Sequence, residues 1–134
     1  MSGRLRNLAA ALMIAAGTTP AFADPLVTAG IGLATCEKLA AGMKPEEGLD
    51  NQPNYLVYYW VQGYMSAANI TTLESDGMYV DLSQYDETKI LPLVYDFCTK
   101  HPNGKPISVI DDLLSSAEKL TGHWEKGTIG WAAE

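Results

Sequence analysis

Apolar residues recur along this chain with the spacing of α-helices, most clearly in its middle. Over residues 55–73 they lie three and four positions apart, in two adjacent rows. One row comprises Leu56, Trp60, Gly63, Ala67 and Ile70, and the other comprises Val57, Val61, Met65 and Ala68. Such spacing places each row along one side of a helix. Three tyrosines widen the apolar surface further, so we expect this helix to lie at the centre of the domain or to share a face with a partner.

Three shorter helices are predicted around this one. The first follows Thr35, a candidate N-cap, carries Cys36 and ends at Gly42. The second follows Asp86 and ends at residues 101–104, and Pro92 predicts either a kink in it or a start at Leu91. The third covers residues 106–122, with one apolar stripe formed by Ile107, Ile110, Leu113, Leu114, Ala117 and Leu120.

The segments between these helices are rich in turn residues. Residues 44–54 are predicted to form a loop, and residues 74–85 a polar turn with at most a short extended piece at 78–80. Residues 24–34 are predicted to be a loose arm, and residues 123–134 a loosely held tail whose Trp124 and Trp131 are candidates to dock on the body. The expected fold class is all-α, a small bundle of about four helices without a convincing sheet.

The first 23 residues have the three parts of a secretory signal peptide. Arg4 and Arg6 form a positive region, an apolar stretch follows at 8–17, and residues 21–23 read Ala-Phe-Ala, a typical cleavage site. Cleavage is therefore predicted after Ala23. The remaining chain, 24–134, is expected to form a single domain with its core at 35–121 and a tail at each end.

The charge balance is acidic and excludes some classes of partner. The formal net charge of −7 becomes −9 when Arg4 and Arg6 leave with the signal peptide. A nucleic-acid-binding protein needs a basic face to neutralise phosphates, so that class is disfavoured. No apolar run reaches the roughly 18 residues that a membrane-spanning helix requires. We therefore expect neither nucleic acid nor membrane as a partner.

Cys36 and Cys98 are the only two cysteines, and both follow the predicted cleavage site. An even pair in an exported chain favours a disulfide, and the alternative is a pair of free buried thiols. In the chain-entropy model, closing so long a loop stabilises the fold by roughly 4 kcal/mol. No Cys-x-x-Cys pair is present, which argues against a redox enzyme.

Residues capable of catalysis or metal binding are scattered rather than clustered. His101 and His123 both fall at predicted helix ends, and Asp76, Asp81 and Asp86 lack the spacing of a calcium loop. The neighbours Asp111 and Asp112 point to different sides of a helix and cannot act as a carboxylate pair. The glycosylation sequence at residues 69–71 lies inside an apolar helix. We therefore predict no catalytic, cofactor or metal residue, and not an enzyme.

Two segments together resemble the HdeA/HdeB family of periplasmic acid-stress chaperones. Residues 90–102 place Cys98 on a helix with a proline six residues earlier and a His-Pro stop shortly after, and residues 35–39 resemble the Thr-Cys start of that family. Trp60 occupies the helix between them, as an aromatic residue does in the family. The resemblance covers about residues 35–120. Residues 60–69 are also similar to small periplasmic helical proteins that include immunity proteins.

The chaperone resemblance implies a small helical domain with one disulfide, located in the periplasm and dimeric at neutral pH. It implies that acid loosens the dimer and exposes apolar surface, which holds unfolding periplasmic proteins without ATP. The residues expected to form that client or dimer surface are Leu56, Trp60, Val61, Tyr64 and Met65. The competing interpretation of these residues is that all of them belong to an ordinary core.

The charge of the chain is compatible with an acid response. Below pH 4, where Asp and Glu become neutral, the mature chain moves from −9 towards about +10. Such a change weakens any compact state or interface that depends on ionised carboxylates. The alternative function, implied by the second resemblance, is that of an immunity protein that neutralises one dedicated partner at neutral pH. Its predicted contact surface is acidic, formed by Asp76, Asp81, Asp86 and Glu87.

Overall fold

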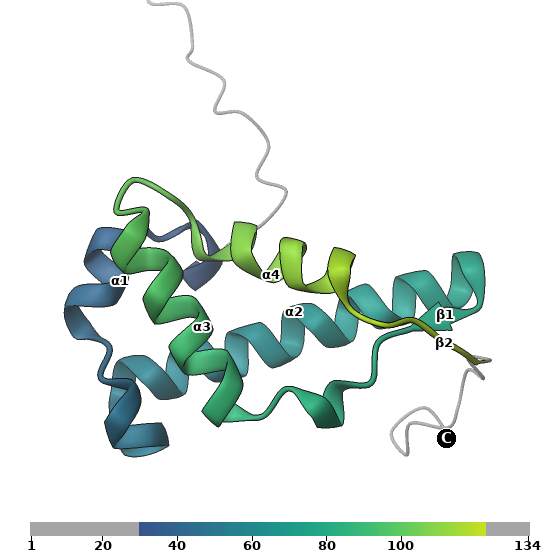
Figure 1. The fold of residues 1–134 in the computed structure, drawn as a ribbon, viewed down its shortest axis with the longest axis horizontal. Helices are drawn as coiled ribbons and strands as arrows, with labels where there is room; N and C mark the ends of the chain where they lie inside the picture. Colours follow the sequence, from purple (N-terminus) through teal and green to yellow (C-terminus); the bar gives the residue numbers. More distant parts are fainter. Residues whose placement is uncertain (1–29, 123–134) are drawn as a thin grey trace, which may run out of the picture.

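A long helix, α2 (Gln52–Asp76), is the spine against which the other elements pack (Figure 1). The structure is a computed structural model that describes residues 30–122. Within that range α1 (Cys36–Gly42) and α3 (Glu87–Lys100) lie over one half of α2, and α4 (Pro106–Ser116) runs over its middle. These four helices confirm the predicted all-α fold. The predicted signal peptide and the residues Trp124 and Trp131 lie outside the described residues.

Local sequence explains where α2 begins and ends. The Asn51 side chain accepts a hydrogen bond from the backbone N–H of Asn54 at 3.1 Å, which caps the first turn. Gly77 ends the helix in the left-handed conformation, with φ of 65°, which glycine adopts without strain. The helix is therefore longer at both ends than the predicted span of 55–73, because its first turn uses part of the predicted loop.

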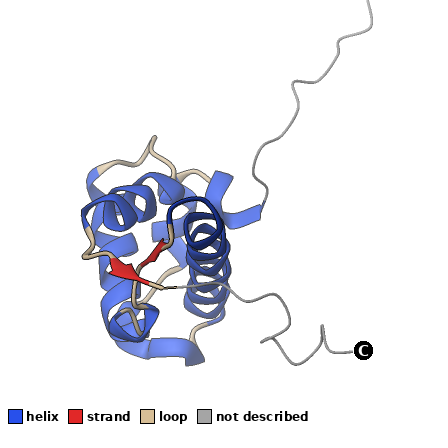
Figure 2. Ribbon diagram, turned by 90° about the vertical axis from the view of Figure 1, so that its right-hand side faces the viewer, coloured by secondary structure: helices blue, strands red, loops and turns tan. Residues whose placement is uncertain are grey.

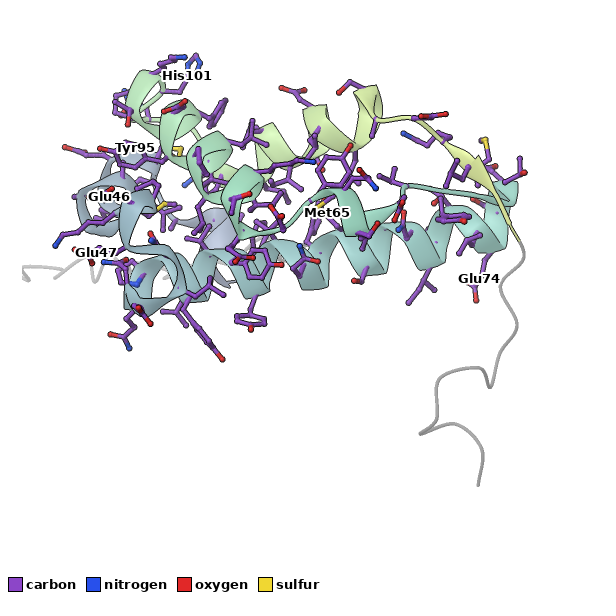
Figure 3. All side chains as sticks on the ribbon, turned by 60° about the horizontal axis from the view of Figure 1, so that its bottom comes forward. Glu46, Glu47, Met65, Glu74, Tyr95 and His101 are labelled. Carbon is purple, nitrogen blue, oxygen red and sulfur yellow. A yellow bond between two sulfur atoms is a disulfide. The ribbon has the colours of Figure 1, made fainter. Side chains whose placement is uncertain are left out.

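The core lies where α2, α3 and α4 face one another. Val57, Val61 and Met65 form the buried side of α2. They pack in one cluster with buried residues from the other helices, namely Ile90, Leu91, Val94, Val109 and Ile110. In Figure 3, Met65 lies towards the other helices while Glu74 projects away from them. The second of the two predicted apolar rows is thus the row that faces the core.

A disulfide joins Cys36 at the start of α1 to Cys98 near the end of α3. The two Cα atoms are 4.4 Å apart, and both side chains are buried in the core. The bond holds a seven-residue helix that is too short to be stable alone. This pairing confirms the prediction from the two cysteines.

Three smaller elements occupy segments that were predicted to be irregular. Residues 30–33 form a 3-10 helix, η1 (Gly30–Leu33), so the predicted loose arm is wrong for this part. A second 3-10 helix, η2 (Pro45–Asp50), lies in the predicted loop, where the buried Asn54 side chain donates to the carbonyls of Lys44 and Gly48. A third, η3 (Leu82–Gln84), precedes α3.

The predicted end of the last helix is also wrong. α4 stops at Ser116, and Leu120 lies in a two-residue strand, β2 (Leu120–Thr121), paired antiparallel with β1 (Met78–Tyr79). Figure 2 shows this small ribbon at one end of the helices. The Lys119 ammonium donates to the carbonyls of Leu114 and Ala117, which satisfies groups that further helical turns would have used. Pairing with β1 then replaces the helical hydrogen bonds of this segment.

Pro92 lies inside α3 rather than at its start. The helix begins at Glu87, directly after Asp86, so a start at Leu91 is excluded. Proline removes one backbone donor, yet Pro92 is on the exposed side of α3, and the buried residues Ile90, Leu91, Val94 and Cys98 still share one face.

Candidate functional site

The five residues predicted to form a client or dimer surface do not lie on one surface. Val61 and Met65 are fully buried in the core, whereas Leu56 on the same helix is 48% exposed. Trp60 and Tyr64 are partly buried and pack against the edge of the core. In the closed fold Val61 and Met65 therefore belong to the core, and their role as a client surface of an opened form stays a prediction. The two apolar rows point in different directions around the helix, so only one of them can face outwards.

The exposed part of α2 instead holds an aromatic cluster at its N-terminal end. Tyr55, Leu56 and Tyr59 are each about half exposed, at 48%, 48% and 52%. The rings of Tyr55 and Tyr59 lie 4.5 Å apart, and Leu56 is three positions before Tyr59 on the helix surface; these three residues are here called the Tyr-Leu cluster. Sequence reasoning missed Tyr55 and Tyr59 as surface residues. The signal that could have found them is the complete absence of charged residues from 51 to 73 in an acidic chain.

This uncharged face continues along α2 past Gly63. A Cβ atom added at Gly63 would meet nothing within 4 Å, and Ala67 one turn later is exposed. The outer face of α2 is therefore exposed and uncharged from the Tyr-Leu cluster to the middle of the helix. Contiguous faces of this kind are typical of interaction surfaces.

Trp60 and Tyr64 link α2 to its neighbours. Their rings stack with centroids 5.5 Å apart and an angle of 13° between planes. The Tyr64 hydroxyl donates to a carboxylate oxygen of Asp111 on α4 at 2.6 Å. This bond, together with burial, raises the pKa of Tyr64 to about 12, because losing the proton would place two negative charges in contact.

Two other carboxylates, Asp81 and Asp86, accept hydrogen bonds that stabilise turns and do not form ion pairs within residues 30–122. Asp81 accepts from the backbone N–H and hydroxyl of Ser83, and Asp86 accepts from the hydroxyl of Thr88 at 2.6 Å. These hydrogen bonds lower the pKa of both carboxyl groups, because they stabilise the ionised form. Asp81 caps η3, and Asp86 is the residue before α3.

Within residues 30–122 a single ion pair is formed, between Lys44 and Glu47 at 2.8 Å. Hydrogen bonds from Lys44 and then from Asn51 lower the pKa of Glu47. The other lysine hydrogen bonds in this range go to backbone carbonyls, as from Lys89 to Gln84. Most carboxylates here therefore remain without a basic partner at neutral pH.

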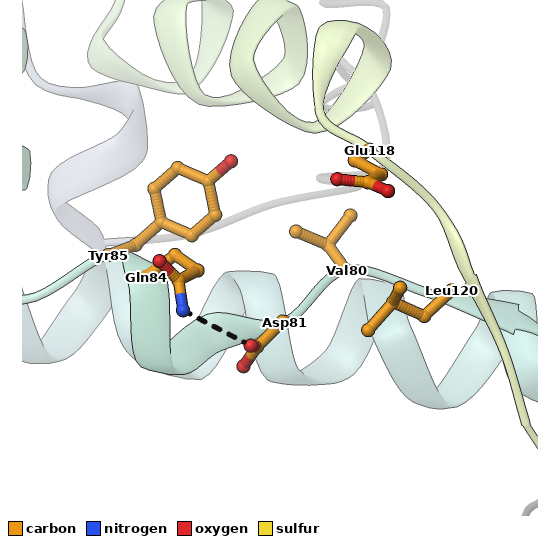
Figure 4. Close-up of a pocket in the computed structure, with 6 residues that line it drawn as sticks. All are labelled: Val80, Asp81, Gln84, Tyr85, Glu118 and Leu120. Atoms are coloured by element: carbon orange, nitrogen blue, oxygen red, sulfur yellow. Dashed lines mark hydrogen bonds between the residues drawn. The ribbon is translucent and has the colours of Figure 1, made fainter.

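A pocket of about 390 Å³ lies beside the ribbon (Figure 4). Its walls combine polar and apolar groups, namely Val80, Asp81, Gln84, Tyr85, Glu118 and Leu120. Asp81 and Glu118 come from different segments, and Asp81 already accepts hydrogen bonds from Ser83 and Gln84. Of the predicted acidic surface only Asp81 lines this pocket, and the pocket lies apart from the Tyr-Leu cluster.

The candidate chemical groups do not come together in the described range. No three His, Cys, Asp or Glu side chains between residues 30 and 122 are grouped as metal ligands. His101 is exposed at the end of α3, and His123 lies outside the described residues. Asn69 of the glycosylation sequence donates to the carbonyl of Val80 and accepts from its N–H, so its amide is already engaged in the fold.

Two further findings complete this description. Among the helices between residues 30 and 122, none combines the length and apolar character needed to cross a membrane. Comparisons of the chain with known protein families, with curated proteins and with solved structures find no match.

Proposed function

We propose that this protein is an ATP-independent chaperone of the periplasm that opens in acid and holds unfolding proteins. The observation that carries the proposal is the character of α2. This helix has no charged residue between 51 and 73, and its second apolar row is buried against α3 and α4. Carboxylate hydrogen bonds stabilise the turns at η3 and at the start of α3 on that side. Opening at that side would make both apolar rows of α2 available to other chains.

The carboxylate contacts give acid a direct way to act. Glu47, Asp81 and Asp86 have lowered pKa values in the folded protein, so they stabilise it at pH values above the unfolded pKa near 4. That contribution is lost as the pH falls through their folded pKa values. In the same range the lysines, histidines and amino terminus lose their acidic counterparts, so repulsion between positive charges adds to the loosening.

The disulfide limits how far the chain opens. Thiol–disulfide exchange requires thiolate, which is scarce in acid, so the Cys36–Cys98 bond persists there. It keeps α1 attached to α3 when other contacts loosen. An opened chain cross-linked in this way can close again when the pH rises.

The outer face of α2 supports a homodimer at neutral pH. Two copies of an acidic chain repel each other, and the uncharged face from the Tyr-Leu cluster to Ala67 is where this repulsion is weakest. Aromatic residues beside an open Gly63 suit close contact between two helices. In this proposal the dimer covers the Tyr-Leu cluster at pH 7 and separates in acid.

The acidic pocket favours a second candidate function. A protein that neutralises one dedicated partner at neutral pH needs a defined contact surface, and Asp81 and Glu118 beside the Tyr85 ring suit a basic side chain. This alternative predicts one stoichiometric partner from a periplasmic extract at pH 7, lost when Glu118 is changed to Gln.

Aggregation assays separate the two functions. The chaperone predicts that the purified protein keeps acid-unfolded malate dehydrogenase in solution at pH 2–4 and has no such effect at pH 7. Absence of protection throughout pH 2–4 would exclude the chaperone. Recovery of one partner at pH 7 together with that absence would establish the alternative.

A further inference from the structure

Gly32 of η1 lies against the benzene ring of the Trp60 indole. A Cβ atom added to Gly32 would come within 2.6 Å of Cη2 and 3.0 Å of Cε2 of Trp60. Distances this short require something to move, so only glycine fits here in the present arrangement. The requirement comes from close approach and not from backbone conformation, because Gly32 is not among the glycines with positive φ.

Trp60 has little freedom to yield to a larger residue. One of its neighbours is the Tyr64 ring, stacked on it, and the Tyr64 hydroxyl is bonded to Asp111 on α4. Trp60 is therefore held in place by contacts with α2 and, through Tyr64, with α4. The surface around Trp60 on which η1 packs is thus rigid, and η1 fits against it.

η1 itself is held by few interactions. It contacts α2 and α4, and the Lys105 ammonium donates to the carbonyl of Leu33 at 2.8 Å. Within residues 30–122, a further backbone bond runs from the N–H of Ala34 to the carbonyl of Ile31, Gly32 is buried against Trp60, and the partly buried Ile31 packs against the core. A four-residue 3-10 helix held in this way belongs to the least stable part of a domain, and such parts open locally without global unfolding.

We propose that η1 is an autoinhibitory strap, which covers an apolar binding site centred on Trp60. When the strap lifts, the Trp60 indole becomes accessible. Leu56 lies one turn earlier on the same side of α2, so the uncovered site is continuous with the Tyr-Leu cluster. The ligand is an apolar segment of an unfolding polypeptide, and in this respect the inference rests on the proposed function.

Lifting of the strap is distinct from opening of the core. Lifting η1 removes the contact of Ile31 with the core, but it breaks neither the disulfide nor the contacts among the buried residues Val57, Val61 and Met65. The binding site can therefore be uncovered while the core remains folded. A variant with a loosened strap should hold unfolding chains even at neutral pH.

The variant Gly32→Ala tests this directly, with Ser115→Thr as its control. Both add one methyl group, but Ser115 is exposed on α4, and its side chain forms no hydrogen bond within residues 30–122. Amide hydrogen exchange at residues 31–34 is expected to be about 5–30 times faster in Gly32→Ala, the factor corresponding to a loss of one or two kcal/mol. At pH 7 this variant is expected to bind an apolar dye and to slow aggregation of heat-unfolded malate dehydrogenase, and Ser115→Thr is expected to do neither.

A second variant tests the inference in case Gly32→Ala fails to fold. Lys105→Met removes the donor to Leu33 without adding a methyl group beneath the strap. It is expected to have the same effects as Gly32→Ala, with unchanged exchange at Val57, Val61 and Met65. Faster exchange of the strap without any gain in dye or client binding at pH 7, in either folded variant, would overturn the inference.

The experiments distinguish failure of the strap inference from failure of the proposed chaperone function. If the unmodified protein protects malate dehydrogenase at pH 3 and the strap variants add nothing at pH 7, the strap inference alone fails. If the unmodified protein gives no protection at pH 3, the proposed function fails. Gain of client binding at pH 7 by the strap variants supports the strap.

Discussion

The Tyr64 hydroxyl on α2 and the Asp111 carboxylate on α4 are joined by a hydrogen bond of 2.6 Å. The two residues are 47 positions apart in the sequence, so the bond joins α4 to the central helix α2. Because Tyr64 also stacks on Trp60, this hydrogen bond connects α4 to the residue on which η1 packs. Its loss would loosen α4 and the strap together.

Replacing Asp111 by Asn should lower the pKa of Tyr64 from about 12 towards its ordinary value near 10. The amide can still accept a hydrogen bond, but the bond no longer involves a charge. Since the site is exposed, we expect a loss of at most about 1 kcal/mol in the free energy of unfolding. Absorbance of tyrosinate during alkaline titration measures the change.

The pH dependence of this contact has a defined sign. The raised pKa means that neutral Tyr64 stabilises the folded state below pH 10, and that this contribution is lost as the pH rises towards 12. The unmodified protein should therefore lose stability over that range more steeply than Asp111→Asn. In Tyr64→Phe the group titrating near 12 should disappear. Identical titrations of the unmodified protein and Asp111→Asn, with the tyrosine lost in Tyr64→Phe titrating near 10, would show that the bond is absent in solution.

Substitutions along α2 should divide into two classes by position. Met65→Ala leaves a cavity in the core and should lower the free energy of unfolding by about 2–5 kcal/mol. Leu56→Ala removes a half-exposed side chain and should change it by no more than about 0.5 kcal/mol. Urea unfolding at pH 7 compares them, and a loss for Leu56→Ala as large as or larger than that for Met65→Ala would contradict the assignment of the buried row.

Removal of the disulfide should cost stability without changing the fold. The double variant Cys36→Ser/Cys98→Ser frees a loop with a sequence separation of 62, which corresponds to a loss of about 4 kcal/mol in the chain-entropy model. We expect the variant to recover poorly when it is returned from pH 2 to pH 7. Circular dichroism before and after that cycle measures recovery. Full recovery of the variant would remove the proposed role of the bond in acid.

Neutralising the three carboxylates that hold turns should flatten the response to acid. The triple variant Glu47→Gln/Asp81→Asn/Asp86→Asn lacks the three carboxyl groups whose pKa values are lowered in the folded protein. Protonation below pH 4 therefore no longer removes their contribution to the free energy of unfolding. The variant should be less stable than the parent at pH 7, and its stability should fall less between pH 4 and pH 2. Thermal unfolding across this range measures both effects.

A second triple variant, Glu74→Gln/Asp96→Asn/Asp112→Asn, is the control for charge. It alters the net charge by the same amount, at exposed carboxylates that form no hydrogen bond within residues 30–122. Its stability should fall with acid as steeply as that of the parent. If both triple variants behave alike, total charge and not the individual turns determines the acid response.

The helices and the disulfide followed from local sequence, whereas the arrangement of α2 did not. Both rows of α2 are apolar, so spacing alone could not decide between Leu56 and Val57 as the buried position. That choice depends on how α3 and α4 pack, because Ile90, Val94 and Ile110 meet the second row. The apolar pattern therefore predicted a central helix correctly, but it could not identify which row is exposed.

Contacts between distant residues explain the other differences. Leu120 continues the helical spacing of α4, but pairing with Tyr79 places it in a strand. Gly32 gives no local signal, because its role is the close approach of Trp60. The bond between Tyr64 and Asp111 is likewise invisible in either segment alone. Each of these features arises from packing between elements.

In the proposed mechanism, acid converts this domain from a closed form to one that binds unfolding proteins. Sedimentation with an apolar dye, followed from pH 7 to pH 2 in the presence and absence of malate dehydrogenase, tests it most directly. We predict a dye-silent dimer at pH 7 and, below pH 4, a dye-binding monomer that sediments with its client. A species that keeps one sedimentation coefficient, binds no dye and leaves the client to precipitate throughout that range would contradict the claim.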